Sequence, residues 1–265
     1  MTEHASAGDS TRIAYSRSGS RSAEPVLLLP GQTLDHTMWD AVRAPFDEAF
    51  DVLALDPRGT GASEAGPDLD YTIELMADDA VAVLDAAGLP RAHVVGFSMG
   101  GRVAQVIAAR HPDRVGGLVL VSTTPGGPHQ VERAPEATRA LKHLRGQEGE
   151  RRMAEHFFTP AFCDAHPQVV EAVLPRIPAA VSRAHFAASM AHDAWPLLPT
   201  IKAPTLVVHG EQDELTPVGN AVLLESCIGD ARLLTIADSR HGVLHEHPDE
   251  TVPMILAFLR AHPMG

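Results

Sequence analysis

The chain has 265 residues, of which 45% are hydrophobic and 21% charged, and its net charge is −13. This composition is typical of a globular protein with a large core, and the negative charge argues against nucleic acids and anionic membrane surfaces as partners. No apolar run is long enough to span a membrane, and the first residues lack the pattern of a secretory signal. Together with only two cysteines, Cys163 and Cys227, these features predict a cytoplasmic protein without a disulfide framework.

Strand-like and helix-like segments alternate along most of the chain. Residues around 11–16 predict an edge strand, and further strands are predicted at Pro25–Leu29, Val52–Leu55, Ala92–Gly96, Val115–Val121, Thr205–His209 and Arg232–Ile236. The helices expected between them run from Thr72, a predicted N-cap, to Gly88, and over Met99–Arg110, Val218–Cys227 and Val252–Ala261. This alternation predicts an α/β fold with a mostly parallel, doubly wound sheet.

The stretch 125–199 interrupts this alternation because it contains no strand pattern. Its helical patches lie around Ala137–Leu144, Arg151–Phe158, Val169–Val173 and Arg183–Met190. A plain crossover needs only about a dozen residues, so the excess predicts a helical lid at 125–199, inserted into a core domain of residues 1–124 and 200–265. The large side chains of the lid either line an apolar substrate pocket or form the lid's own small core; they are Phe157, Phe158, Phe162, Phe186, Met190 and Trp195.

The residues Gly96-Phe97-Ser98-Met99-Gly100 form a G-x-S-x-G sequence between a predicted strand and the helix after it. This is the sequence form of a nucleophile elbow, a sharp turn that presents a serine hydroxyl at the end of the sheet. Glycine on both sides avoids the clash that a Cβ would make, and the turn aims the Met99 N–H at a forming oxyanion. Ser98 is therefore the predicted nucleophile, although the pentapeptide alone also fits an ordinary glycine-rich turn.

A serine nucleophile needs a histidine base, and the base needs an acid to orient it. His241 follows the last predicted strand and Asp213 follows the strand before it, so both fall at the carboxyl edge of the sheet, where catalytic groups gather. The chain order of serine, acid and histidine is the one found in α/β-hydrolases. His241 and His245 also have the spacing of a zinc pair, but the role of base explains His241 better, and no metal is predicted.

Five motifs in chain order carry a resemblance to a known family. They are Pro25–Gln32 followed by Trp39, Asp56–Ser63, Gly96–Gly101, Pro204–Asp213 and His241–Pro248. Through them, and over nearly its whole length, the chain resembles the lid-bearing α/β-hydrolases of the small esterase, lactonase and non-haem haloperoxidase type. The resemblance implies the α/β-hydrolase fold with its inserted lid, and an enzyme that uses no cofactor.

By the same resemblance, the oxyanion hole consists of the backbone N–H groups of Met99 and Gln32, and Gly31 lies beside the substrate. The family usually has His-Gly before this loop, whereas this chain has Pro30-Gly31. The missing histidine is usually a structural hydrogen-bonding residue, so the loop is expected to be held differently here. The side-chain amide of Gln32 either donates to substrate or braces the loop, and the sequence leaves both open.

These residues predict a serine hydrolase that cleaves an ester or lactone of a small or medium neutral metabolite through an acyl-enzyme on Ser98. Hydrolysis of a carbon–carbon bond ranks lower, because Gly242 follows the histidine where the family's carbon–carbon hydrolases commonly have an aromatic residue. Perhydrolysis uses the same triad and stays open as a side reaction. A small-molecule receptor, an accessory protein or a cyclase on the same fold is the alternative from another class.

Overall fold

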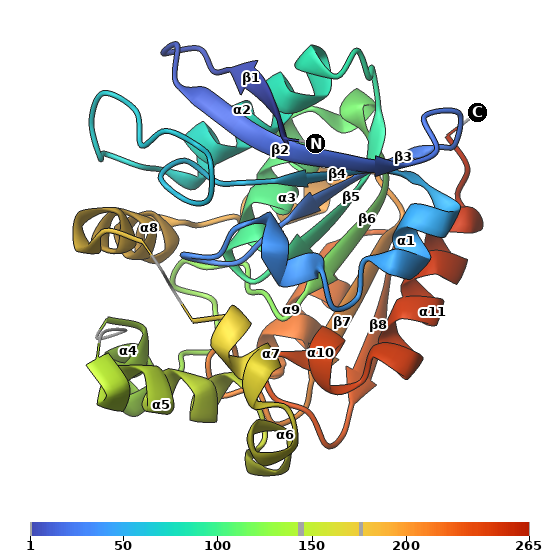
Figure 1. Ribbon diagram of the computed structural model, residues 1–265. Helices are drawn as coiled ribbons and strands as arrows, with labels where there is room; N and C mark the ends of the chain where they lie inside the picture. The colour runs from blue at the N-terminus through green and yellow to red at the C-terminus, as the bar shows by residue number, and fades with distance from the viewer. Residues whose placement is uncertain (1, 143–145, 175–176, 265) are drawn as a thin grey trace.

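An eight-stranded sheet forms the centre of the protein in the computed structural model, which describes residues 2–142, 146–174 and 177–264 (Figure 1). The order across the sheet is β1-β2-β4-β3-β5-β6-β7-β8. The strands are β1 (Thr2–Ser6), β2 (Arg12–Gly19), β3 (Pro25–Leu29), β4 (Asp51–Leu55), β5 (Ala92–Phe97), β6 (Val115–Val121), β7 (Thr205–Gly210) and β8 (Ala231–Ile236). β2 is antiparallel to β1 and β4, and the other neighbouring pairs are parallel. The predicted strands and the predicted parallel sheet are thus confirmed.

The prediction of an edge strand around residues 11–16 was wrong in its position. β2 lies one place inside the sheet, because β1 pairs with it on the outer side. β1 has no apolar pattern by which it could be predicted, since Ala5 is its one buried residue and the rest are polar or charged. Such an outer strand is held by backbone hydrogen bonds rather than by a buried apolar face, so it leaves no alternating pattern.

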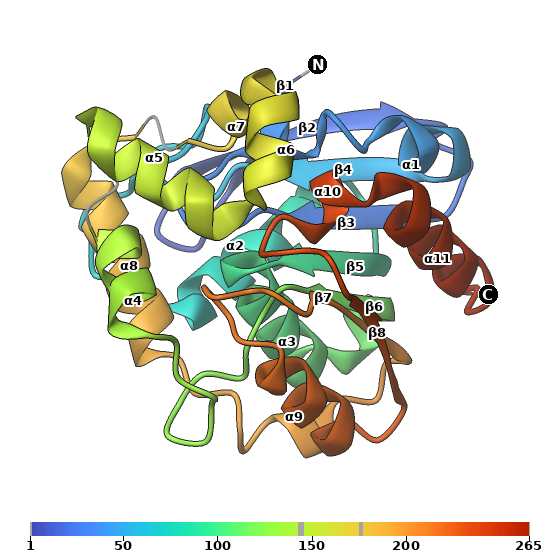
Figure 2. The ribbon, with the colours of Figure 1, turned by 90° about the horizontal axis from the view of Figure 1, so that it is seen from below.

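Helices cover both faces of the sheet. On one face lie α2 (Ile73–Ala86), α3 (Met99–Arg110) and α9 (Gly219–Cys227), and on the other lie α1 (Ala44–Ala49), α10 (Val243–Glu246) and α11 (Pro248–Arg260) (Figures 1 and 2). The Thr72 hydroxyl caps α2 by accepting from the Leu75 N–H, as predicted. Strand residues alternate between two apolar clusters, so that Leu27 packs on the α2/α3 side and Leu28 on the α1/α11 side. The sheet is therefore buried on both faces, as a parallel sheet requires.

A helical insertion, residues 122–204, separates β6 from β7. Its helices are α4 (Pro135–Lys142), α5 (Gly146–Phe157), α6 (Pro160–Ala165), α7 (Pro167–Ala172) and α8 (Ala179–Ala191). They gather beyond the end of the sheet where the parallel strands finish (Figures 1 and 2). The patterns placed four of these helices, although α5 begins earlier than expected, and α6 was missed. Residues 143 and 144 of the first predicted patch lie outside the described residues.

Short 3-10 helices complete the chain at His36–Trp39, Pro112–Arg114 and Leu198–Thr200. The last helix, α11, begins at Pro248, four residues before the predicted start, and proline is favoured at that first position. Within the described ranges, no helix has both the length and the apolar composition needed to cross a bilayer.

Candidate active site

The turn between β5 and α3 places Ser98 in a backbone conformation that side chains rarely adopt, with φ +53° and ψ −114°. A Cβ at Gly96 would collide with the carbonyl oxygen of Gly100, and a Cβ at Gly100 would collide with that of Leu29. The Ser98 N–H donates to the carbonyl of Val121, 2.9 Å away, which fixes the turn to β6. The glycines therefore permit the strained turn that exposes the serine hydroxyl at the sheet edge.

The imidazole of His241 lies against this hydroxyl. Its Nε2 is 2.9 Å from the Ser98 Oγ, which is hydrogen-bonding distance for a base and its nucleophile. The rings of Phe97 and Phe157 pack edge-on against the imidazole, with centroids 5.0 and 5.1 Å from it. The backbone of His241 is fixed as well, because the Ser122 hydroxyl donates to its carbonyl over 2.8 Å.

Asp213 accepts from the other nitrogen of the imidazole. The distance from His241 Nδ1 to Asp213 Oδ2 is 2.7 Å, and the carboxylate is buried. Its second oxygen accepts from the N–H groups of Leu215 and Thr216, each at 2.8 Å, and the Thr216 hydroxyl donates to Oδ2 over 2.6 Å. Burial raises the pKa of Asp213, but the nearby His241 and the hydrogen bonds outweigh it and hold that pKa well below its usual range. The acid therefore stays ionised, which favours the Nδ1–H tautomer and leaves Nε2 free to accept.

The loop after β3, which contains Gln32, lines the same cavity as Ser98. Neither the Met99 N–H nor the Gln32 N–H has an acceptor among the described residues, so both remain available to an incoming oxygen. Thr33 has φ +67°, and its N–H donates to Nδ1 of His185 on α8 over 3.2 Å. His185 Nε2 in turn donates to the Arg58 carbonyl, 3.0 Å away.

The imidazole of His185 therefore ties the Gln32 loop to the turn at Asp56–Ser63, and it does so from the insertion. Burial lowers the pKa of His185 to about 4, so the ring is neutral at physiological pH and its Nδ1 can accept. Arg58 is fixed at the same turn, since its guanidinium forms a bidentate pair with Asp79 at 2.7 Å. His185 thus helps to hold the loop that follows Pro30-Gly31 in this chain.

The histidine loop is joined to the insertion by Glu246. Its carboxylate accepts from the Thr159 N–H at 2.6 Å, from the Arg240 N–H at 2.7 Å and from the Ser239 hydroxyl at 2.8 Å. A Cβ at Gly242 would collide with the ring of Phe158, so the insertion packs directly against the residue after His241. The position of the imidazole therefore depends on both parts of the chain.

Ser98 lines a small cavity of about 30 Å³. From the insertion it is lined by Arg133, Leu141 and Ser189, and from the core by Gln32, Ser98, Met99, Arg102, Leu215, Thr216 and His241. A second cavity of about 10 Å³ shares Gln32 and Leu141 with the first and adds Phe157. A larger depression beside Asp35 and α7 contains none of the three residues Ser98, Asp213 and His241.

The other aromatic residues predicted to line the pocket lie elsewhere. Phe158 is fully buried and stacks on Phe162, with ring centroids 4.8 Å apart. Trp195 stacks on His129, and Phe186 lies beneath the ammonium group of Lys142. Met190 is 50% exposed, whereas its neighbour Ser189 faces the cavity. Gly31 packs against the ring of Phe97. Of the predicted lining residues, Phe157 is the one that borders either cavity, while Phe158, Phe162 and Phe186 pack with the apolar cluster on the α1/α11 side of the sheet.

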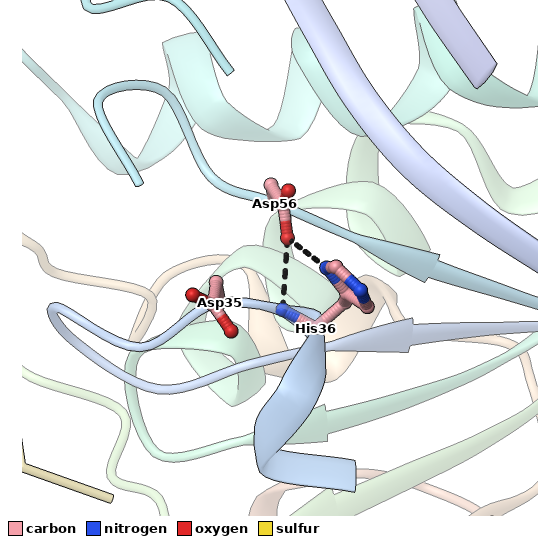
Figure 3. Close-up of side chains that lie close together, drawn as sticks. All are labelled: Asp35, His36 and Asp56. Atoms are coloured by element: carbon pink, nitrogen blue, oxygen red, sulfur yellow. Dashed lines mark hydrogen bonds and ion pairs between the residues drawn. The ribbon is translucent and has the colours of Figure 1, made fainter. Parts of the chain in front are cut away.

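Asp35, His36 and Asp56 lie close enough together to suggest a metal site, and Figure 3 shows their arrangement. One Asp56 oxygen accepts from the N–H of His36 at 2.9 Å and from its Nδ1 at 2.6 Å, and the other accepts from the Ala62 N–H at 2.9 Å. Asp35 accepts from the Thr37 N–H and caps a 3-10 helix. These hydrogen bonds explain why the three residues lie together, since they hold the turn at Asp56–Ser63. His245, considered as a zinc partner of His241, instead contacts the Met38 carbonyl through Nε2 at 2.9 Å.

Arg102, Arg133 and His185 belong to the site region and were missed in the sequence. Arg102 carried a usable signal, since it lies four residues after Ser98 on a predicted helix, and that spacing puts both on one face. Arg133 and His185 carried none, because their positions depend on how the insertion folds over the sheet.

The comparisons with known proteins agree with this architecture. The family model described as alpha/beta hydrolase fold matches residues 24–164. "Putative carbamate hydrolase RutD" of Variovorax paradoxus is 34% identical over 77% of this chain and 80% of its own. "2-hydroxy-6-oxononadienedioate/2-hydroxy-6-oxononatrienedioate hydrolase" of Burkholderia vietnamiensis is 29% identical over 96% of this chain and 92% of its own. The crystal structure of the enol-lactonase from Burkholderia xenovorans superposes with a TM-score of 0.86, at 28% identity over 97% of this chain and all of that one. The chain belongs to the α/β-hydrolase fold family, as the motifs predicted.

Proposed function

We propose that the protein is a serine hydrolase that cleaves a carboxylic ester or a lactone through an acyl-enzyme on Ser98. The observation that carries the proposal is the chain of contacts from the Ser98 hydroxyl to His241 at 2.9 Å and on to Asp213 at 2.7 Å. The enol-lactonase among the similar structures supports the same class of reaction. The segment 125–199 then serves as a lid over the cavity.

In the first half-reaction, Ser98 Oγ attacks the carbonyl carbon while its proton passes to His241 Nε2. The N–H groups of Met99 and Gln32 bind the resulting oxyanion, and Asp213 stabilises the imidazolium. The carbonyl then re-forms, and the leaving alkoxide takes the proton from His241. In the second half-reaction, His241 removes a proton from water as the water attacks the acyl-serine, and it returns that proton to Ser98 Oγ when the acyl–oxygen bond breaks and the acid leaves.

Carbon–carbon bond hydrolysis is less well supported. The position after the catalytic histidine, where an aromatic residue commonly stands in hydrolases of that kind, is Gly242, and Phe158 fills the space beside it. A side chain at 242 has no room without displacing that ring. Ester or lactone cleavage needs no such residue.

A panel of acyl-chain esters and lactones tests the proposal, with the wild type and Ser98→Ala compared on each compound. We expect turnover by the wild type, with a burst of p-nitrophenol from p-nitrophenyl acetate, and a loss of several orders of magnitude in kcat for the variant. Circular dichroism checks that the variant is folded. Tight binding of a panel member without turnover would instead indicate a receptor, and equal turnover by both proteins would refute the role of Ser98.

A further inference from the structure

Two arginines face the cavity of the proposed nucleophile. Arg102 lies on α3, one helical turn beyond Ser98, and is only 4% exposed. Arg133 lies in the segment that leads into α4 and lines the same cavity. Among the described residues, no carboxylate forms an ion pair with either guanidinium. Elsewhere in the chain the buried arginines are paired, as Arg58 is with Asp79.

Hydrogen-bond donors without acceptors surround the same space. Arg102 donates through Nη1 to the Ser189 carbonyl, and its other N–H groups have no acceptor within the described part of the chain. The Gln32 Nε2 and the Ser189 hydroxyl are also buried without a partner, and both residues line the cavity. Buried donors are normally satisfied, so this cluster indicates an acceptor that enters with a ligand.

The charges around the cavity are not balanced by the protein. Burial, followed by the nearby Arg133, lowers the pKa of Arg102 to about 9, and burial also lowers the pKa of Arg133. Arg102 is buried and Arg133 is half-buried, and cations that lose water without gaining an anionic partner carry a desolvation cost. Asp213 is the acid that attracts Arg133, but its oxygens already accept from His241, Leu215 and Thr216.

We propose that Arg102 and Arg133 form an anion subsite that binds a carboxylate carried by the substrate, beside the carbonyl that Ser98 attacks. Guanidinium groups match a carboxylate through paired N–H donors. The net charge of −13 repels anions at long range, so the attraction must come from local cations such as these. The inference rests on the proposed hydrolase function and proposes carboxylate-bearing esters or lactones in place of the neutral metabolites expected from the sequence.

Matched pairs of substrates test the subsite directly. One member is the monoethyl ester of malonic, succinic, glutaric or adipic acid, and the other is the same ethyl ester with a primary amide in place of the free acid. Hydrolysis is followed by pH-stat titration near neutral pH and at physiological ionic strength. For the chain length that fits best, we expect kcat/KM for the acid to exceed that for the amide by tenfold or more, as charged hydrogen bonds allow (about ten- to a hundredfold each). A ratio near one at every length would overturn the proposal.

Variants assign the preference to the two arginines. Arg133→Met should lower the acid-to-amide ratio about tenfold, mainly through KM for the acid, and Arg133→Lys should retain part of it. Arg102→Met should act in the same direction. If Arg102→Met fails to fold because Arg102 is buried, Arg133→Met alone tests the subsite. Arg139→Met is the matched control, because Arg139 is exposed on α4 and pairs with Glu136, so it removes the same charge from the insertion without changing the ratio. An unchanged ratio in Arg133→Met would contradict the subsite.

Binding to Ser98→Ala separates this inference from the proposed reaction. Calorimetry with the acid and the amide needs no turnover. Tighter binding of the acid, lost in Ser98→Ala/Arg133→Met, would support the anion subsite even if the wild type hydrolysed neither compound, and the hydrolase proposal alone would then fail. Turnover of both compounds without preference, with equal binding to Ser98→Ala, would leave the hydrolase in place and refute the subsite.

Discussion

The imidazole of His185 is predicted to position the oxyanion loop, and His185→Leu tests this. The substitution leaves the Thr33 N–H and the Arg58 carbonyl without their partners at 3.2 and 3.0 Å. Each buried group left unsatisfied costs about 1–3 kcal/mol, so the free energy of unfolding should fall by about 2–6 kcal/mol for the two groups. The Gln32 N–H lies next to Thr33 in this loop, and loss of one oxyanion donor lowers kcat by about 10²–10³-fold. With partial relaxation, we expect kcat to fall at least tenfold and KM to change little.

The assay combines steady-state hydrolysis of p-nitrophenyl acetate with urea unfolding, and His93→Leu is the matched control. His93 is also fully buried, and its Nδ1 likewise accepts a backbone N–H, that of Gly117 at 2.8 Å. It lies near the start of β5, at the opposite end of the strand from Ser98. This control should lose about 1–3 kcal/mol of stability and keep its kcat. If His185→Leu were destabilised to a similar degree but kept kcat within about twofold, the positioning role would be refuted.

Three further predictions concern the triad, the elbow and pH. Asp213→Asn should lower kcat on any substrate by about 10³–10⁴-fold, because the amide no longer enforces the productive tautomer, and a loss under tenfold would contradict its role. Gly100→Ala should destabilise the fold by several kcal/mol or prevent folding, since its Cβ meets a backbone oxygen, whereas Gly229→Ala, with nothing near the new Cβ, should be tolerated in urea unfolding. Burial lowers the pKa of His185 to about 4 and that of His192 to about 3. The unfolded chain therefore binds more protons below about pH 6.5, so stability should be full above that pH and fall by about 1 kcal/mol per histidine at about pH 5.5; a flat urea midpoint would contradict this.

Much of the fold was predictable because its signals are local. Parallel strands buried on both faces read as short apolar runs, and the glycines of the elbow mark a turn that no other residue permits. The Ser98, Asp213 and His241 positions followed from the ends of predicted strands, because a parallel sheet brings those ends to one edge. β1 escaped detection because a polar outer strand depends on backbone pairing.

The lining of the cavity could not be predicted in the same way. Whether Phe158 or Ser189 faces the substrate depends on the rotation of the helices in the insertion, and their apolar pattern fits a self-contained core equally well. The pairing of His185 with Thr33 joins residues 152 positions apart, which no local spacing encodes. Arg102 was overlooked for a different reason, since a charged residue in a helix usually indicates a solvated face.

The most direct test of the account is the location of a covalent adduct after exposure to a fluorophosphonate, read by peptide mass spectrometry. The account predicts a single modified peptide containing Ser98, formed slowly in His241→Ala and absent in Ser98→Ala. Modification at another residue, or none in a protein that still turns over esters, would show that the hydroxyl, imidazole and carboxylate at this sheet edge do not work as one nucleophilic unit.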